Sequence, residues 1–323
     1  MRWSRSPLPE PETFCPAETT INHPTATTMN IVIQPEALQS EDRSLLPGGA
    51  LTAMAYLQHH GIKLMIDLSR LSDKQQKLLQ NEGVVSAAFN EDAASGTINK
   101  KEKLQFLVQD TAAAEADDWR ELARKILFPS RKAEVKRSTK ETDLTVAINL
   151  DGTGISDVQT GLSFFDHMLD QIARHGMVDL TIRCDGDLDV DEHHTIEDTA
   201  IALGQAIHNA LSADKAGIQR YGFVLPMDEA QATVAIDLSN RPYLRWEVEL
   251  QREYVGDFPT EMLEHFYYTL AMNAKATLHV KADGKNEHHI IESVFKSFAR
   301  ALRFAVSRNE RTQGVLPSTK GTI

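Results

Sequence analysis

The sequence predicts a mixed α/β protein whose C-terminal part is a tandem duplication. Short apolar segments with strand-like alternation lie between longer segments of helical periodicity. After residue 133 one order of elements occurs twice: strands, a short helix that carries a histidine, a strand, an Asp-Gly turn and a long helix that opens with His-His. Because a repeated order of elements indicates a duplicated unit, we expect two similar halves, at about residues 133–220 and 221–323.

The predicted elements of the two halves correspond in order. In the first half they are a strand at 144–150, a helix at 164–175, a strand at 180–183 and a long helix at 192–211. In the second half they are strands at 232–237 and 244–249, a helix at 260–273, a strand at 276–280 and a long helix at 289–306. The turns before the long helices match as well, since Asp185-Gly186-Asp187 corresponds to Asp283-Gly284-Lys285.

The N-terminal part is predicted to hold a smaller α/β unit over residues 29–130. Strands at 30–33, 62–66 and 105–108 accompany a helix at 50–60, which Gly61 suits as a C-cap, and this alternation favours a small parallel sheet. Residues 1–28 are rich in Pro and Thr and are predicted to be a disordered tail, so Met29 is an alternative start. Residues 128–137 carry a proline and a basic cluster, and we interpret them as the linker into a second domain, residues 131–323.

Composition narrows the classes of protein. The 323 residues include 46 acidic and 34 basic side chains, a net charge of -12, which argues against nonspecific nucleic-acid binding. The chain has no run of about 18 apolar residues, so we expect no transmembrane helix and no membrane partner. Two cysteines, Cys15 and Cys184, do not suggest a disulfide framework and fit a reducing cytoplasm.

Two histidine-rich motifs predict a metal centre. His193-His194 is followed by Glu197, and His288-His289 is followed by Glu292. Residues four apart lie on one face of a helix, so the first histidine and the glutamate of each motif can hold one cation. The second histidine lies about 100° further around the helix and points to a different cation. Two such helices facing each other would therefore build a dinuclear site by exchanging ligands.

The short helix of each half adds a further histidine to this set. The predicted ligands are six imidazoles and two carboxylates: His167, His193, His194, Glu197, His265, His288, His289 and Glu292. Mixed imidazole and carboxylate ligands suit Mn, Fe or Zn rather than Ca or Mg. Cationic side chains at Arg220, Arg241, Lys296 and Lys320 are of the kind that binds phosphate, which suggests an anionic small-molecule substrate.

These motifs make residues 133–323 resemble the imidazoleglycerol-phosphate dehydratases, hydro-lyases of histidine biosynthesis. The resemblance is carried by segments 140–142, 165–176, 186–198, 241–242, 264–266, 288–296 and 316–321. It implies dehydration of D-erythro-imidazole-glycerol phosphate to imidazole-acetol phosphate in the cytoplasm. It also implies the family's duplicated fold of two sheets packed against helices, and a homo-oligomeric shell of 24 subunits with active sites at the subunit interfaces.

The resemblance further implies two Mn(II) ions per active site, which stabilise an imidazolate form of the substrate. One ion would take His167, His194, His288 and Glu292, and the other His193, Glu197, His265 and His289. The substrate phosphate would lie against Arg220, Arg241, Lys296, Ser318, Thr319 and Lys320, and its diol and imidazole ring against Glu141, Gln171 and His175. Glu141 and Glu292 are alternative proton-abstracting bases, and His175 is a candidate acid. Thr319 and Asn240 depart from the family's usual Ser and Gly.

The N-terminal residues 29–115 resemble a degenerate haloacid-dehalogenase-type histidinol-phosphate phosphatase, a domain that some bacterial members carry. That fold needs Asp-x-Asp-x-Thr after its first strand, but here Gln34 stands at the position of the nucleophile. Of the two metal-binding acids expected after the third strand, only Asp110 remains. We therefore predict that this region has no phosphatase activity; an unrelated α/β appendage is the alternative interpretation.

Two other classes of function remain open. A dinuclear metallohydrolase acting on a phosphoester would release phosphate, but it favours a carboxylate that bridges two metals, and this ligand set is poor in acids. A metal-binding or scaffold protein without turnover is the other class, but it would not explain why Lys296 and the segment 317–320 are present. Formation of the ketone product, with free phosphate assayed in parallel, distinguishes the three.

Overall fold

The computed structural model describes residues 29–40, 42, 45–109, 111–212, 215–308, 311, 312, 315, 318 and 319. The predictions for the 1–28 tail, for Asp110 and for Lys320 lie outside the described residues. The chain divides into two compact units, residues 1–100 with 107–111 and residues 101–106 with 112–323. Within the described ranges no helix is long and apolar enough to cross a membrane.

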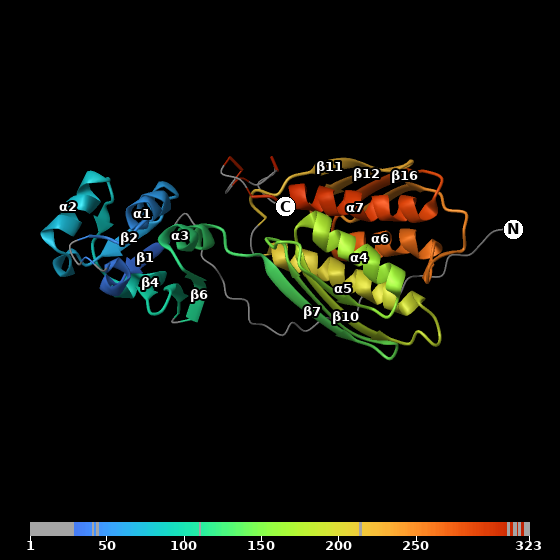
Figure 1. Cartoon of the computed structure of the whole chain (residues 1–323), viewed down its shortest axis with the longest axis horizontal. Coiled ribbons are helices and arrows are strands. Elements are labelled where there is room, and N and C mark those ends of the chain that lie inside the picture. Colours follow the sequence, from blue (N-terminus) through green and yellow to red (C-terminus); the bar gives the residue numbers. More distant parts are fainter. Residues whose placement is uncertain are drawn as a thin grey trace. The chain divides into compact units, whose positions relative to one another are not determined.

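Parallel strands form the centre of the N-terminal unit (Figure 1). Strand β1 (Asn30–Ile33) pairs in parallel with β2 (Lys63–Ile66) and β4 (Gly96–Lys100), and β2 pairs in parallel with β3 (Ser86–Ala87). The whole sheet has the order β3-β2-β1-β4-β5-β6, where β5 is Leu104–Val108 and β6 is Thr111–Ala116. The predicted parallel sheet is confirmed for the strands at 30–33 and 62–66, and its central strand is buried because Ile31, Val32 and Ile33 are all apolar.

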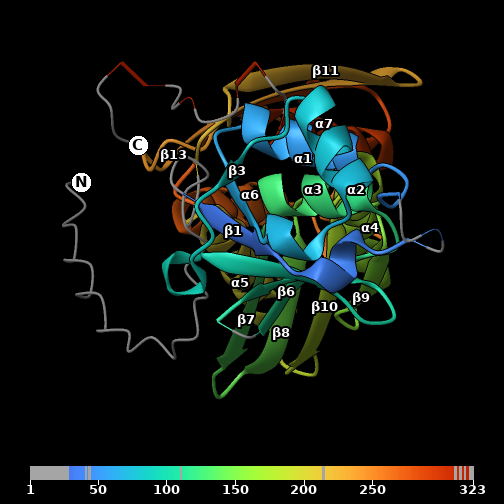
Figure 2. The same cartoon turned by 90° about the vertical axis from the view of Figure 1, so that its left-hand side faces the viewer.

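Helices α1 (Ala50–His59) and α2 (Asp73–Asn81) belong to this unit and are labelled in Figure 2. Ser72 and Gln75 form a capping box at the start of α2, which accounts for where that helix begins. The remaining local elements are the 3-10 turns η2 (Pro35–Leu38), η3 (Leu68–Arg70) and η4 (Glu91–Ala93), and helix α3 (Trp119–Leu127) follows β6.

Two four-stranded sheets of identical topology make up the duplicated part. The first has the order β7-β8-β10-β9, with β7 Lys132–Ser138, β8 Thr142–Asn149, β9 Ser156–Gln159 and β10 Asp179–Gly186. The second has the order β11-β12-β16-β13, with β11 Tyr221–Met227, β12 Ala230–Asp237, β13 Tyr243–Val248 and β16 Thr277–Asp283. In both sheets the first three strands are antiparallel neighbours and the last pair is parallel. The predicted tandem duplication is therefore confirmed.

The interpretation of residues 128–137 as a linker is wrong for most of that segment, because β7 begins at Lys132 and pairs antiparallel with β8. The sequence does not predict this strand, because its charged residues alternate with only two apolar residues. Ala133 and Val135 are partly buried against the core, whereas the alternating Lys132, Glu134 and Lys136 do not join it.

Four helices fill the space between the two sheets (Figure 1). They are α4 (Ser163–Gly176), α5 (His193–Ser212), α6 (Glu261–Asn273) and α7 (Glu287–Ala305). Helix α5 packs on β7 and β8, and α7 packs on β11 and β12; between them α4 packs against α7, and α6 against α5. A two-stranded ribbon, β14 (Tyr254–Val255) with β15 (Phe258–Pro259), precedes α6.

The core of this unit is a single apolar cluster to which both sheets and all four helices contribute. On α7 the fully buried residues Ile291, Val294, Phe295, Phe298 and Leu302 recur at helical spacing. Burying each such side chain contributes about 1.5–3 kcal/mol. This packing holds the helices rigidly, so side chains at their ends are presented from a fixed scaffold.

Glycine is required in the turn before each long helix, where backbone and side chains approach closely. A Cβ atom at Gly186 would lie 2.0 Å from Thr195 Oγ1 on α5, and one at Gly284 would lie 2.7 Å from Ala230 Cβ on β12. No side chain fits at either position. The two Asp-Gly turns matched in the sequence therefore seat the first turns of α5 and α7, which carry the histidine pairs.

Candidate metal centre

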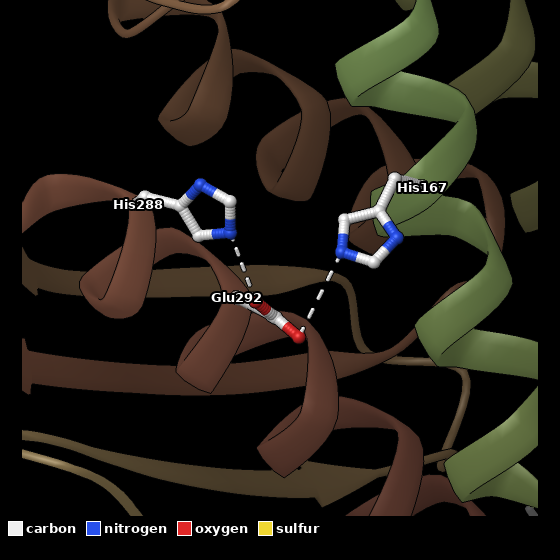
Figure 3. A group of neighbouring side chains, drawn as sticks. All are labelled: His167, His288 and Glu292. Atoms are coloured by element: carbon white, nitrogen blue, oxygen red, sulfur yellow. Dashed lines mark hydrogen bonds and ion pairs between the residues drawn. The ribbon is translucent and has the colours of Figure 1, made fainter.

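The first cluster of potential ligands joins α4 to α7. His167 comes from α4, and His288 and Glu292 come from the first turns of α7; their ligand atoms all lie within 4.8 Å of one another (Figure 3). His288 Nε2 is 3.0 Å from Glu292 Oε2, and His167 Nε2 is 3.8 Å from Glu292 Oε1. The spacing of four residues on α7 brings the first pair together, and the packing of α4 on α7 adds the third side chain.

The second cluster joins α5 to α6 in the same manner. His193 and Glu197 lie four residues apart on α5, and His265 approaches from α6. Glu197 Oε2 is 3.6 Å from His193 Nε2, and Glu197 Oε1 is 3.2 Å from His265 Nε2. His265 Nε2 is buried and makes no hydrogen bond with the described part of the chain. A buried imidazole nitrogen aimed at a carboxylate without a hydrogen bond suits a metal ligand.

Each triad takes residues from both halves of the repeat. We expected the two long helices to face each other and exchange ligands; within one described chain they do not. A long helix instead meets the short helix of the other half, α7 with α4 and α5 with α6. The physical reason is the layer between the sheets, in which α5 and α7 lie on opposite sheets and the short helices fill the space between them.

The second histidine of each pair lies outside both triads. His194 Nδ1 donates a hydrogen bond of 3.2 Å to Asp187 Oδ1, and its Nε2 is 3.7 Å from Glu141. His289 Nδ1 donates one of 2.9 Å to Glu229 Oε2. These hydrogen bonds are the main cause of the raised pKa of both imidazoles, and the bond to His289 lowers the pKa of Glu229 to about 2.

Sequence reasoning did not identify Asp187 or Glu229. A signal was available, because the repeat places Glu229 in the β11–β12 hairpin turn at the position that Glu141 occupies in the β7–β8 turn. Each hairpin thus brings a carboxylate to the second histidine of the following long helix, His194 in the first half and His289 in the second.

The donor set of each triad, two imidazoles and one carboxylate, fits a divalent transition metal. Glu292 is anionic in this setting: burial alone would raise its pKa, but the hydrogen bond and charge of Lys296 outweigh burial and lower it. Three protein ligands leave positions open on an octahedral ion. The described residues of one chain thus supply two candidate metal sites of three ligands each, and His194 and His289 are the predicted ligands that join neither.

Several residues predicted to contact substrate gather beside the first triad. Lys296 Nζ is 2.8 Å from Glu292 Oε1, and the Gln171 amide donates a hydrogen bond of 2.9 Å to the His167 carbonyl. Desolvation lowers the pKa of His175, and the positive charges of Lys296 and Arg300 lower it further. The neutral imidazole of His175 is therefore favoured near pH 7, which suits a hydrogen-bond donor or base more than a charged acid.

The two predicted phosphate-binding arginines lie elsewhere in the same chain. Arg220 Nε is 2.7 Å and Arg241 Nη2 is 3.3 Å from the same atom, Asp237 Oδ2. The N–H of Gln219, next to Arg220, donates to the carbonyl of Ala305 at the end of α7. Residues 296 and 305 are separated by about 14 Å along a helix. Lys296 and the arginines of one chain therefore do not share one small ligand.

Asn240, which precedes Arg241, adopts a left-handed conformation with φ 58°. Glycine and asparagine are the residues that accept this conformation most readily, which explains how Asn240 stands where the family usually has Gly. Ser318 and Thr319 are among the described residues, whereas Lys320 lies outside them. Cys184 takes no part in either triad, and burial raises the pKa of its thiol to about 11.

The chain is similar in sequence to known proteins. Residues 160–302 match the family model described as imidazoleglycerol-phosphate dehydratase. The chain is 52% identical over 195 residues to the imidazoleglycerol-phosphate dehydratase of Dinoroseobacter shibae, covering 60% of this chain and 100% of that one. It is 54% identical over 206 residues to the histidine biosynthesis bifunctional protein HisB of Spirosoma linguale, covering 64% of this chain and 54% of that one.

The crystal structure of imidazoleglycerol-phosphate dehydratase from Staphylococcus aureus superposes with a TM-score of 0.51 at 35% identity, covering 55% of this chain and 99% of that chain. The fold and its paired triads define a duplicated α/β protein with two candidate metal-binding clusters between helices. The chain belongs to the imidazoleglycerol-phosphate dehydratase family. Its match spans about half the length of the bifunctional relatives, 54% in the Spirosoma protein.

Proposed function

We propose that this protein dehydrates imidazole-glycerol phosphate to imidazole-acetol phosphate, a step of histidine biosynthesis, with two Mn(II) ions in each active site. The observation that supports this most directly is the pair of triads, His167, His288 and Glu292 on one side and His193, Glu197 and His265 on the other. Membership of the dehydratase family supports the choice of reaction. A phosphoester hydrolase is disfavoured, since neither triad contains a carboxylate shared with the other.

The complete site is proposed to form between copies of the chain. Among the described residues each triad has three potential protein ligands, and His194 and His289 belong to neither triad. If His194 of one copy joins the His167–His288–Glu292 triad of another, Glu141 travels with it, because His194 Nε2 and Glu141 are 3.7 Å apart. Glu141 then arrives beside Gln171, His175 and Lys296. His289 would complete the His193–Glu197–His265 triad in the same way.

The same argument accounts for the split phosphate residues. Lys296 stands beside the first triad, whereas Arg220 and Arg241 cluster on Asp237 near the far end of α7. A neighbouring copy that brings its Arg220 and Arg241 to Lys296 would surround a phosphate with three cations. Arginine forks and a lysine suit that dianion, which anchors and orients the substrate. We propose a closed homo-oligomer, with 24 subunits as the size implied by the family resemblance.

The roles of the residues follow from their partners. Bound Mn(II) supplies Lewis acidity that stabilises negative charge on the substrate imidazole. Both oxygens of Glu292 are engaged, one by His288 and one by Lys296, so Glu292 is better placed as a ligand than as the base. Glu141 is half exposed and is our choice for the residue that takes the carbon-bound proton. His175 is proposed to hold the departing hydroxyl through its ring N–H.

No phosphatase activity is proposed for the N-terminal unit. Its first strand, β1, runs into Gln34 and the η2 turn, and an amide cannot act as a nucleophile toward phosphorus. The relationship of this unit to the haloacid-dehalogenase fold stays a prediction.

The test is a turnover assay on chelator-treated protein with and without added Mn(II), measuring imidazole-acetol phosphate and free phosphate in parallel. We expect Mn(II)-dependent formation of the ketone with no release of phosphate. Release of phosphate without formation of the ketone would contradict the dehydratase assignment and indicate a hydrolase. Metal binding without formation of either product would indicate a metal-binding protein without turnover.

A further inference from the structure

The two histidines that lie outside the triads differ from the others in which ring nitrogen meets the nearest carboxylate. The triad histidines His167, His193, His265 and His288 all approach their glutamate through Nε2. His194 and His289 instead make their shortest carboxylate contact through Nδ1, to Asp187 at 3.2 Å and to Glu229 at 2.9 Å. The distinction occurs in both halves of the repeat, although the carboxylate comes from the turn before the long helix in the first half and from the β11–β12 turn in the second.

Glu229 is itself held firmly. It lies in the turn between β11 and β12, and its Oε1 accepts hydrogen bonds from the backbone N–H of Asn286 at 2.7 Å and of Lys285 at 3.3 Å, immediately before α7. Its other oxygen, Oε2, is the one that faces His289. One carboxylate therefore clamps the start of the helix with one oxygen and the imidazole with the other.

The chemistry of this contact fixes the protonation pattern of the ring. An ionised carboxylate only accepts hydrogen bonds, so the proton of neutral His289 must reside on Nδ1. Nε2 is then left with its lone pair, which is the form of imidazole that binds a metal. Asp228 Oδ2 lies 3.8 Å from Nε2, which is beyond hydrogen-bonding distance, and its side chain is 77% exposed; Glu292 acts on the ring only through its charge.

We propose that Glu229 is a positioning residue that presents Nε2 of His289 to a metal ion held by the His193–Glu197–His265 triad of a second copy. This inference rests on the proposed function, because it requires metal binding between copies. Glu229 touches neither triad of its own chain. Its effect on metal binding could pass through His289 or through the start of α7 that it clamps, and only the route through His289 disappears when His289 is removed.

The experiment titrates Mn(II) into metal-free full-length protein and counts free ion by electron paramagnetic resonance, for wild type, Glu229→Gln, His289→Ala and the double variant. Glu229→Gln should weaken Mn(II) binding about 10- to 100-fold at half of the sites, the range typical for a lost partner of a ligating histidine. In the His289→Ala background, Glu229→Gln should produce no further change. Glu247→Gln is the matched control, since Glu247 pairs only with Arg245 and Lys281 in the described structure.

Each result decides the matter. Two results would overturn the positioning role: a wild-type Mn(II) affinity in Glu229→Gln, or an equal loss of affinity with and without His289. Neither result would affect the proposed dehydratase activity, which the turnover assay tests separately. If wild-type protein binds no Mn(II), the proposed function fails and this inference fails with it. Comparison of the thermal unfolding midpoints of the metal-free proteins separates a positioning effect from general loosening, because only the latter lowers that midpoint along with the affinity.

Discussion

The ammonium of Lys296 lies 2.8 Å from Glu292 Oε1, one helical turn after that carboxylate on α7. The ion pair holds a positive charge at the edge of the first triad, on a side chain that is only 20% exposed. A cation held in place next to a metal site is suited to receive the anionic end of a substrate. The consequences of this arrangement can be measured.

Replacing Lys296 with Gln should weaken substrate binding without abolishing metal binding. A hydrogen bond to a charged group is worth about 1.5–3 kcal/mol, so we expect KM to rise about 10- to 100-fold. Steady-state kinetics with a parallel Mn(II) titration provide the measurement. Lys281→Gln, an exposed lysine on β16, serves as the control and should keep the wild-type KM. An unchanged KM in Lys296→Gln would remove Lys296 from the phosphate site.

Glu292 is the carboxylate of the first triad, and replacing it with Gln should remove one class of metal site. The variant keeps the shape of the side chain but loses the charge, so we expect Mn(II) binding to fall at half of the sites by at least about 100-fold and turnover to disappear. Metal titration and the ketone assay report on the two effects. Wild-type turnover in this variant would contradict the ligand set.

Sharing of ligands between copies can be tested by mixing two inactive variants. Co-expression of His167→Ala with His194→Ala leaves about a quarter of the sites of the first kind intact, if His194 comes from another copy and pairing is random. We expect a corresponding recovery of turnover over either variant alone. The control mixture, His167→Ala with His288→Ala, should recover nothing, because these two residues belong to one triad of one chain. Equal behaviour of the two mixtures would place all ligands within one copy.

The close approach of α5 and α6 depends on Gly204. A Cβ there would lie 2.7 Å from Asn273 Cβ and 2.8 Å from the Leu270 carbonyl oxygen. Gly204→Ala must therefore push apart the helices that carry the second triad, and overpacking of this kind costs about 1–3 kcal/mol. The free energy of unfolding measured in urea and the affinity for Mn(II) should both be lower than in wild type. Gly222→Ala is the matched control, since its Cβ would meet Ala235 Cβ at an ordinary 3.7 Å.

Stability should fall in acid partly through Asp151. Burial would raise the pKa of this carboxyl, but the hydrogen bonds and charge of Arg131 outweigh burial and bring it below the ordinary value of 3.8. A carboxyl with a lowered folded-state pKa contributes stability that is complete above its unfolded pKa and is lost as the pH falls through the folded value. The free energy of unfolding of wild type should therefore decline below about pH 4 more steeply than that of Asp151→Asn.

At neutral pH the Asp151→Asn variant should be the less stable protein. Arg131 is 6% exposed, and breaking a buried pair by removing one partner costs about 3 kcal/mol. Urea unfolding of both proteins at pH 7 and pH 3 gives the comparison. Asp157→Asn, which breaks an exposed pair with Arg183, should have little effect. Parallel acid curves for wild type and Asp151→Asn would refute the assignment.

Most elements of the fold could be predicted because their apolar periodicity is strong. The four helices of the repeat and strands β8, β10, β12, β13 and β16 lie where the pattern indicates. Strands with weak patterns were missed or misread. Ser156–Gln159 in β9 has a single apolar residue, β11 contains Gly222 and Pro226, and β7 alternates charges with Ala and Val. These segments form strands because they pair with neighbouring strands and pack against the helices.

The sequence alone determined the duplication, the helices and the types of the eight candidate ligands, since these depend on local periodicity and on spacing within one helix. Only the tertiary structure decided that α4 meets α7 and that α5 meets α6, because this choice depends on which helix each sheet buries. It also decided that His194 and His289 stand apart from the triads, with His194 bound through Nδ1 to Asp187 in the turn before its own helix and His289 bound through Nδ1 to Glu229 in the β11–β12 turn. Contacts between residues far apart in the chain are set by packing of the whole core, and no local pattern encodes them.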